Sequence, residues 1–470
     1  MSVDDFLLKN DFQLRAGSRS GLWMLFLLPL SIIISAFKHS ITTTPTYKLA
    51  SLICTGMVLV SFTIILQRNK NQKLNLLNIW NIGALIVTSV LFHMCFQRGW
   101  LFCIFGGSFS TLAYLNFYKF ILTKFKECFS LGEAGFVSQG LTLFSFFTIS
   151  NVLNHSLRIV PFRSNMQIST LILQLGLTGI GIIAFSCYCF KIKSTVAFYS
   201  TSILAILSTI IIPLHILLQR SPVLWIVNQM FDDWSTIKLI MYWIFCTCIA
   251  VLAVSNQIFY AKKASTITRK IFHALAVAVY IPGLLYRCSF LYLASGVVLG
   301  IFFALEILRN LRIPPLGIYL QDGFVVFSDE KDCEQLALTP IYLLAGCSLP
   351  IWIHPSPCDV TDSASFNLVI LLSGLLSIGV GDSMASIVGS HYGKFSWPGT
   401  KKTVEGTLAC VLSQVGLIYL LIYFDCIRPL SSYDSVKILS AIVVTSLVEA
   451  KTTQVDNLAL PLVMYIILIL

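Results

Sequence analysis

The sequence from residue 366 to residue 389 reads FNLVILLSGLLSIGVGDSMASIVG. A helix of this length can cross the hydrocarbon core of a bilayer, which takes about 20 apolar residues. Its charged residue is Asp382, which lies among small residues near the end of the run. A polar, lysine-bearing stretch follows at once, from residue 390 to residue 407: SHYGKFSWPGTKKTVEGT. We therefore expect a membrane helix that ends at a polar site.

The whole chain is unusually apolar. Its 470 residues are 56% hydrophobic and 11% charged, whereas an ordinary soluble domain has about 25% charged residues. A soluble core cannot bury so much apolar surface, and apolar runs of roughly 16 to 23 residues recur along the chain. The predicted fold class is therefore all-α: a polytopic integral membrane protein with about 13 to 15 transmembrane helices.

The apolar runs divide into two regions. The N-terminal multi-span membrane region, residues 1–260, has runs at about 22–37, 50–66, 78–96, 99–117, 136–153, 168–190, 195–218 and 239–260. The C-terminal region, residues 261–470, has runs at about 271–286, 288–308, 338–353, 366–389, 407–424, 436–448 and 458–470. The last two suit a re-entrant hairpin as well as two crossings, because a short helix of 13 residues rises only about 20 Å.

The distribution of polar residues predicts different roles for the two regions. The N-terminal region does not group polar residues as a reaction requires, so we expect a lipid-facing or lipid-guiding scaffold there and the catalytic groups in residues 261–470. The first run lacks a small-residue cleavage site, which predicts an uncleaved span. The 14 cysteines are scattered through apolar runs. They indicate buried free thiols more than a metal site or a disulfide framework.

The net charge of +11 comes from Lys and Arg in short connections between runs, which is typical of membrane orientation and not of a nucleic-acid groove. With a cytosolic N-terminus, roughly 22 Lys and Arg fall on the cytosolic side and roughly 10 on the other, as the positive-inside rule predicts. Successive connections lie on alternate sides of the membrane. Counting from a cytosolic N-terminus predicts that residues 390–405 face the cytosol and that the sequon at Asn154 faces the lumen.

Asp382 and the stretch after it are the first candidate site. An aspartate at membrane depth is costly to bury and indicates function, with a metal ion or a cation as partner. The small residues around it also suit close helix packing. In residues 390–403, glycines, hydroxyls and lysines suit polyphosphate binding, and Glu405 opens a helix whose N-terminus favours anions. A positive loop beside lipid headgroups is the alternative interpretation.

Four further groups of polar side chains lie next to apolar runs. Residues 268–273, TRKIFH, bring Arg269, Lys270 and His273 to the start of a span. Glu306 and Arg309 are three residues apart, so they can pair with each other or face the same polar cavity. Beyond them lies the longest polar connection, whose acidic stretch 328–332 suits a solvated turn, or a metal or substrate lid. Residues 449–457 hold Glu449 and Asp456, which can join Asp382 around a metal–nucleotide complex.

These stretches resemble the dolichol kinase family, the polyprenol kinases of the endoplasmic reticulum. The resemblance rests on GDSMAS (381–386), WPGTKKTVEGT (397–407) and LVEAKTTQVDNLALPL (447–462), and on TRKIFH (268–273), LEILR (305–309), SDEKD (328–332) and LTPIYLLAGCSLPIW (338–352). It covers roughly residues 262–470, and the N-terminal region resembles the family only in hydropathy and length.

The resemblance implies CTP-dependent transfer of a phosphate to dolichol with a divalent cation, Mg²⁺, in the endoplasmic reticulum membrane, for the synthesis of glycan donors used in protein glycosylation. It implies a CTP-binding segment of Ser390, His391, Tyr392, Gly393, Lys394, Phe395, Ser396, Trp397, Pro398, Gly399, Thr400, Lys401, Lys402, Thr403, Val404 and Glu405.

The resemblance also suggests a role for each candidate residue. Lys401 and Lys402 would hold the β- and γ-phosphates, assisted by Gly393 and Lys394. The expected catalytic residues are Asp382, Lys402 and Glu405. Asp382 would hold the metal or act as base toward the dolichol hydroxyl, and Asp456 and Glu405 are the further metal candidates. The expected lipid or auxiliary site consists of Arg269, Lys270, His273, Glu306 and Arg309.

Three other functions compete with this interpretation. A CTP:phosphatidate cytidylyltransferase, or a CTP-dependent kinase of diacylglycerol or phytol, shares the aspartate and the KKTxEG pattern. The TTQVDN stretch (452–457) favours the dolichol branch. A transporter also carries intramembrane charge, but no repeat relates the two regions.

Overall fold

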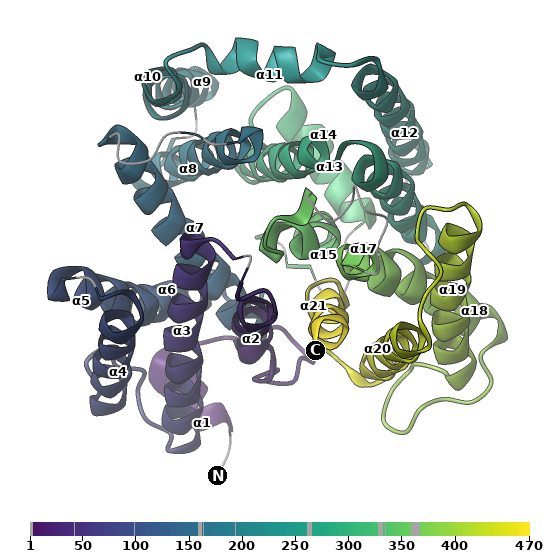
Figure 1. The fold of residues 1–470 in the computed structure, drawn as a ribbon, viewed down its shortest axis with the longest axis horizontal. Coiled ribbons are helices and arrows are strands. Elements are labelled where there is room, and N and C mark those ends of the chain that lie inside the picture. The colour runs from purple at the N-terminus through teal and green to yellow at the C-terminus, as the bar shows by residue number, and fades with distance from the viewer. Residues whose placement is uncertain are drawn as a thin grey trace.

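The structure is a computed structural model in which the described residues are 3–41, 43–97, 99–157, 162, 164–192, 194–260, 266–327, 332, 333, 335–358 and 367–470. Its regular elements are helices (Figure 1). Bridges between single residues join Cys333 to Leu336 and Ser396 to Thr403. Residues 328–331 of the acidic connection lie outside the described residues, as do Lys193, Lys262 and Lys263 from the predicted basic connections.

The helices of the first half follow the predicted runs, except for α1 and α11, which lie outside them. They are α1 (Val3–Asn10), α2 (Met24–Lys38), α3 (Pro45–Asn69), α4 (Ile79–Phe96), α5 (Trp100–Ser108), η1 (Phe109–Ala113), α6 (Tyr114–Lys124), α7 (Leu131–Ser156), α8 (Asn165–Phe190), α9 (Thr195–Ala205), η2 (Ile206–Ile211), α10 (Ile212–Leu218), α11 (Pro222–Phe231) and α12 (Trp234–Phe259). The elements labelled η are π-helical turns within longer helices.

The helices of the second half are α13 (Thr266–Leu311), α14 (Leu316–Phe327), α15 (Thr339–Ile353), α17 (Asn367–Leu371), η3 (Leu375–Asp382), α18 (Ser383–Tyr392), α19 (Val404–Tyr423), α20 (Ser432–Lys451) and α21 (Asp456–Ile469). The runs 271–286 and 288–308 form the two arms of α13, which is kinked at Arg287 (φ −148°, ψ 62°). Helix α14 lies in a connection expected to be polar.

The predicted class, an all-α polytopic membrane protein, is confirmed. Within the described residues, nine helices are long and apolar enough to cross a membrane, and four shorter apolar helices accompany them. The total of 13 to 15 spans stays a prediction. Helix α20 has 20 residues, which corresponds to about 30 Å and is long enough for a crossing.

The helices at the centre of the bundle are extensively buried against one another, whereas those at one edge are largely exposed. Helix α21 packs against α2, α15 and α20 at the centre of the bundle (Figure 1), and the largest hydrophobic core joins residues from both halves of the chain. Helices α9 to α12 form an outer arc, where the most apolar windows of Thr195–Leu218 and Trp234–Phe259 are only 11% buried. Their exposed apolar side chains suit contact with lipid.

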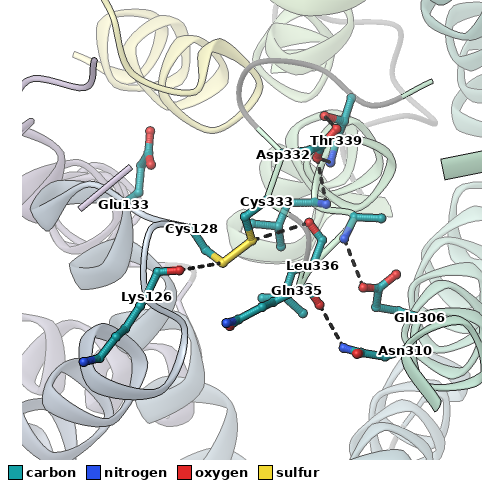
Figure 2. The surroundings of a disulfide bond; sticks show 12 residues. Lys126, Cys128, Glu133, Glu306, Asn310, Asp332, Cys333, Gln335, Leu336 and Thr339 are labelled. Atoms are coloured by element: carbon teal, nitrogen blue, oxygen red, sulfur yellow. Dashed lines mark hydrogen bonds between the residues drawn. A yellow bond between two sulfur atoms is a disulfide. The ribbon is translucent and has the colours of Figure 1, made fainter. Parts of the chain in front are cut away.

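The prediction of free thiols is wrong for four cysteines. Cys128 bonds to Cys333 across 205 residues of sequence, and Cys288 bonds to Cys358. The other ten are free. The Cys128–Cys333 bond joins the segment before α7 to the segment before α15 (Figure 2). Spacing in sequence did not predict these pairs, because the partners are brought together by the helix packing.

Helices α15 and α21 approach closely at Gly346. A Cβ atom at this position would lie 2.0 Å from the backbone oxygen of Asn457. We predict that Gly346→Ala lowers the free energy of unfolding by about 1–3 kcal/mol, because the added carbon forces two backbones apart. The measurement is the melting temperature of the purified full chain in detergent.

Gly416→Ala is the matched control for this substitution, because no atom lies within 4 Å of a Cβ atom at Gly416 in α19. Its melting temperature should equal or slightly exceed that of the wild type, since alanine favours a helix over glycine. Equal melting temperatures for Gly346→Ala and the wild type would contradict the packing described for α15 and α21.

Candidate active site

Five helical segments and one loop surround a cavity of about 340 Å³. The cavity collects polar groups from the start of α13, the start of α15, the region of Asp382, the 401–403 loop, the start of α19 and the junction of α20 with α21. Its lining residues are Arg269, Lys270, His273, Thr339, Tyr342, Asp382, Ala385, Ser386, Gly389, Ser390, Lys401, Lys402, Thr403, Gly406, Thr407, Glu449, Val455, Asp456 and Asn457.

Asp382 is held at one wall of this cavity. It is the last residue of the π-helical turn η3 and is only 6% exposed. Its Oδ2 atom accepts a hydrogen bond from Lys270 Nζ at 2.5 Å and lies 3.8 Å from His273 Nε2. π-helical turns occur frequently at functional sites, because they redirect a side chain within an otherwise regular helix. The structure thus provides the cationic partner expected for a buried aspartate.

Lys402 also lines this cavity and lies between two acidic residues. Its Nζ atom is 2.5 Å from Glu449 Oε1 and 3.7 Å from Asp456 Oδ2, and it also donates to the backbone oxygen of Glu449 at 2.6 Å. Burial opposes the charged form of Lys402, but the carboxylates of Asp456 and Glu449 outweigh burial and raise its pKa above the usual range. Lys402 is therefore a fixed positive charge at neutral pH.

The stretch from Gly393 to Thr403 folds as a small hairpin. Trp397 N donates to the Lys402 oxygen at 2.8 Å, and Val404 N donates to the Phe395 oxygen at 2.8 Å. Gly399 turns the chain with φ +74°, a conformation that favours glycine. Thr403 then caps α19, accepting from Gly406 N at 3.2 Å. The hairpin thereby delivers its lysines next to a helix N-terminus.

The structure distributes the predicted CTP-binding residues over two environments. Ser390, Lys401, Lys402 and Thr403 line the cavity. The others form the rest of the hairpin and its flanks, which are largely exposed. The Glu405 carboxylate accepts from Phe395 N at 3.2 and 3.3 Å. It therefore holds the hairpin against α19, whereas Asp382 faces the cavity.

The predicted auxiliary residues also separate into two groups. Arg269, Lys270 and His273 line the cavity. Glu306 and Arg309 pair with each other instead, at 2.6 and 2.9 Å, and Glu306 accepts from Ala337 N at 3.0 Å. They support the segment before α15, as Figure 2 shows for Glu306.

Asp332, at the end of the acidic connection, caps α15. It accepts from Thr339 N at 2.9 Å and from Thr339 Oγ1 at 2.8 Å. Its position supports the start of the helix that brings Thr339 and Tyr342 to the cavity wall. Neither residue was predicted as a site residue, because both lie at the start of an ordinary apolar run (338–353).

The acidic side chains of the cavity fit a metal–nucleotide complex. Within the described residues, no group of three or more His, Cys, Asp or Glu side chains is arranged to hold a metal by itself. Mg²⁺ does not require such a group, because it takes one or two carboxylates and completes its shell with phosphate oxygens and water. Asp382 and Asp456 both line the cavity and supply two such carboxylates.

The sequence is similar to a known protein family and to several of its members. A family model described as dolichol kinase matches residues 109–351. Dolichol kinase of Homo sapiens is 37% identical over 370 residues, which cover 76% of this chain and 67% of that protein. Dolichol kinase EVAN of Arabidopsis thaliana is 30% identical over 475 residues, which cover 90% of this chain and 81% of that protein.

This chain belongs to the dolichol kinase family. The family likeness extends further than the sequence motifs indicated, because the matched residues 109–351 include much of the N-terminal region. The expectation that this region resembles dolichol kinases only in hydropathy and length is therefore wrong. Dolichol kinase of Saccharomyces cerevisiae is more distant, at 27% identity over 53% of this chain and 44% of that protein. No solved structure matches the chain.

The ion pairs of Lys402 predict a stability difference between two neighbouring lysines. Lys402→Met leaves the buried Glu449 and Asp456 without this cation, so we expect a loss of about 1–3 kcal/mol in the free energy of unfolding. Lys401 is exposed, so Lys401→Met should change stability by less than about 0.5 kcal/mol. Thermal melting of the two purified variants makes the comparison.

A raised pKa in the folded state gives stability that is lost only as the pH rises through that pKa. The difference between Lys402→Met and the wild type should therefore be fully present at neutral pH and shrink only in strongly alkaline solution. Equal melting temperatures of the two lysine variants at neutral pH would contradict the role given to Lys402.

Proposed function

We propose that this protein transfers the terminal phosphate of CTP to the hydroxyl of dolichol, giving dolichyl phosphate and CDP. The observation that carries the proposal is that Asp382 and Lys402 face one cavity beside a lysine-bearing hairpin. The names of the relatives support dolichol as the acceptor. The resemblance of residues 390–405 to the CTP-binding segment of the family supports CTP as the donor.

The donor phosphates fit the side of the cavity formed by the hairpin and α19. Lys401 is exposed and lines the cavity, so its ammonium can reach the β- and γ-phosphates. Lys402 lies deeper, where its charge faces the phosphate that is transferred. The N-terminus of α19 adds a partial positive charge. Gly393 and Lys394 would assist from the exposed part of the hairpin.

The acceptor fits the side that Asp382 occupies. In the transfer, the dolichol oxygen forms a bond to the γ-phosphorus, and the bond from that phosphorus to the β–γ bridging oxygen breaks as CDP leaves. The hydroxyl proton passes to the Asp382 carboxylate, which also orients the hydroxyl toward the phosphorus. Lys270 fixes Asp382 in place, and Arg269 and His273 complete this wall as the lipid or auxiliary site.

A divalent cation, Mg²⁺, would neutralise charge on the phosphates when it is bound. We propose that Asp456 holds it. Asp382 is the alternative ligand, and it would then hold the cation instead of accepting the hydroxyl proton. Glu405 has a different proposed role, since its carboxylate fixes the hairpin through Phe395 N. It would contribute to catalysis by positioning the lysines of the hairpin. We therefore do not propose Glu405 as a metal ligand.

We propose that the protein lies in the endoplasmic reticulum membrane with the cavity facing the cytosol, where CTP is available. The excess of Lys and Arg on that side supports this orientation. Dolichyl phosphate made there would supply glycan donors for protein glycosylation. We also propose that residues 1–260 form the multi-span membrane region and residues 261–470 the catalytic region, with the CTP-binding loop at 390–405.

Removing the charge of Asp382 tests the chemical step. We predict that Asp382→Asn lowers kcat for dolichol phosphorylation by CTP at least about 100-fold, because a general base contributes about 10²–10⁴-fold. The KM for CTP should change much less, since Lys401, Lys402 and α19 remain. The measurement uses purified full-length protein in vesicles that contain dolichol.

Asp322→Asn on α14 is the control, because Asp322 is exposed and does not line the cavity. It should keep the wild-type kcat. Parallel assays offer diacylglycerol and phosphatidate in place of dolichol. A wild-type rate in Asp382→Asn would overturn the site assignment, and transfer of CMP to phosphatidate would overturn the proposed reaction.

The two disulfides test the proposed orientation, because they lie at opposite ends of the bundle. Cys128–Cys333 lies beside the cavity, next to the segment that precedes Thr339, whereas Cys288–Cys358 lies near the far ends of α15 and of the first arm of α13. Disulfides persist in the lumen but are reduced in the cytosol. A cytosolic cavity therefore predicts that the Cys128–Cys333 bond of the structure is open in cells, whereas Cys288–Cys358 stays oxidised.

Acid quenching of intact cells, followed by differential alkylation and mass spectrometry, measures the state of each pair. Cys410 serves as the internal control, because it is buried and free. The opposite pattern, with Cys128–Cys333 oxidised and Cys288–Cys358 reduced, would contradict a cytosolic cavity.

A further inference from the structure

The segment that carries Asp456 is anchored to the first third of the chain by a buried ion pair. Glu133 on α7 accepts a hydrogen bond from Val455 N at 2.9 Å through Oε1. The same oxygen accepts from Arg15 Nη2 at 2.7 Å. Glu133 is 0% exposed and Arg15 is 6% exposed. Two charges from the predicted scaffold region thus hold the residue directly before Asp456.

Glu133 is placed for this contact by its position at the start of α7. Its Oε2 atom accepts from Ser130 N at 3.0 Å, and Ser130 Oγ accepts from Glu133 N at 3.2 Å. This reciprocal capping box fixes the side chain in one orientation. The second carboxylate oxygen is thereby directed away from its own helix, toward Arg15 and Val455.

A second set of hydrogen bonds holds Gln454, the residue directly before Val455. Ser130 Oγ donates to Gln454 Oε1 at 2.5 Å, and Gln454 Nε2 donates to the backbone oxygen of Arg19 at 2.9 Å. The neighbouring chain leaves little room for movement, since a Cβ atom at Gly21 would lie 2.2 Å from Gln454 Oε1. Residues 454 and 455 are therefore held by both the side chains and the backbone of the N-terminal region.

The Glu133–Arg15 ion pair is better explained by the positioning of the 455–456 segment than by a gain in stability. Burying two charges is costly, and well-packed apolar side chains of similar volume often give equal or greater stability. A carboxylate, however, fixes a backbone N–H in direction and distance, which an apolar side chain cannot do. The N–H that it fixes belongs to Val455, and the next residue presents its carboxylate 3.7 Å from Lys402 Nζ.

We propose that Glu133, oriented by Arg15, is a positioning residue that fixes Asp456 relative to Lys402 in the cavity. This inference deepens the proposed function and rests on it for its effect on catalysis. Catalytic constellations lose activity when a group moves by about 1 Å. The hairpin that holds the CTP phosphates is fixed by other contacts, so loss of Glu133 should lower kcat more than it raises the KM for CTP.

The test compares Glu133→Gln with Asp11→Asn in the full-length protein in vesicles. Asp11 pairs with Lys126 across the same two segments, but its side chain is 75% exposed, so it is a matched control. Glutamine keeps the size of Glu133 but cannot accept hydrogen bonds at both ends. Glu133→Gln should lower kcat at least tenfold and change the KM for CTP less than threefold, and Asp11→Asn should match the wild type.

Hydrogen exchange gives a readout that does not depend on activity. In Glu133→Gln, the peptide that covers residues 449–458 should exchange faster than in the wild type and in Asp11→Asn. If the wild type fails to phosphorylate dolichol, the proposed reaction is wrong, and hydrogen exchange still decides whether Glu133 positions the segment. Unchanged kcat with unchanged exchange, or a change in KM alone, would overturn the inference.

Val455→Pro replaces Glu133→Gln if that variant does not fold. Val455 has φ −68°, which proline also adopts, so the substitution removes the N–H that Glu133 accepts. Because the Val455 side chain also lines the cavity, faster exchange of residues 449–458 must accompany the loss of kcat. The same selective loss of kcat is expected. A folded Val455→Pro variant with the wild-type kcat would overturn the inference.

Discussion

The contact of Lys402 with Glu449 and Asp456 is the interaction on which the cavity depends. It joins the end of the 393–403 hairpin to the end of α20 and the start of α21. Acidic side chains that are buried, as Glu449 and Asp456 are, lower stability unless a cation accompanies them. Lys402 therefore neutralises the carboxylates at both helix ends and places a positive charge in the cavity, so it contributes to stability and is available for chemistry.

A second ion pair, between Lys270 and Asp382, stabilises another part of the cavity lining by the same principle. Lys270 on α13 holds Asp382 where η3 gives way to α18. Each part thus combines one lysine with at least one carboxylate, and the two parts come from segments far apart in sequence. The Glu133–Arg15 pair extends this arrangement into the N-terminal region. The scaffold region is therefore part of the support for the cavity.

Much of this could be predicted from the sequence, because it depends on local patterns. Apolar runs predicted the helical membrane class, and Asp382, Lys402 and Asp456 stood out as charges next to such runs. The rest depends on which segments meet. Glu133 reads as an ordinary helix cap, and its contact with Val455 spans 322 residues of sequence. Tyr342 and the four bonded cysteines were missed for the same reason, and α14 was missed because it lies in a connection read as polar.

The position of the transferred phosphorus tests the central claim most directly. Purified protein in vesicles that contain dolichol would receive CTP labelled with ³²P at either the γ- or the α-phosphate. The account predicts that label from γ-labelled CTP appears on dolichol and that label from α-labelled CTP stays in the nucleotide. Label from the α-phosphate in the lipid, or no transfer from either donor, would contradict it.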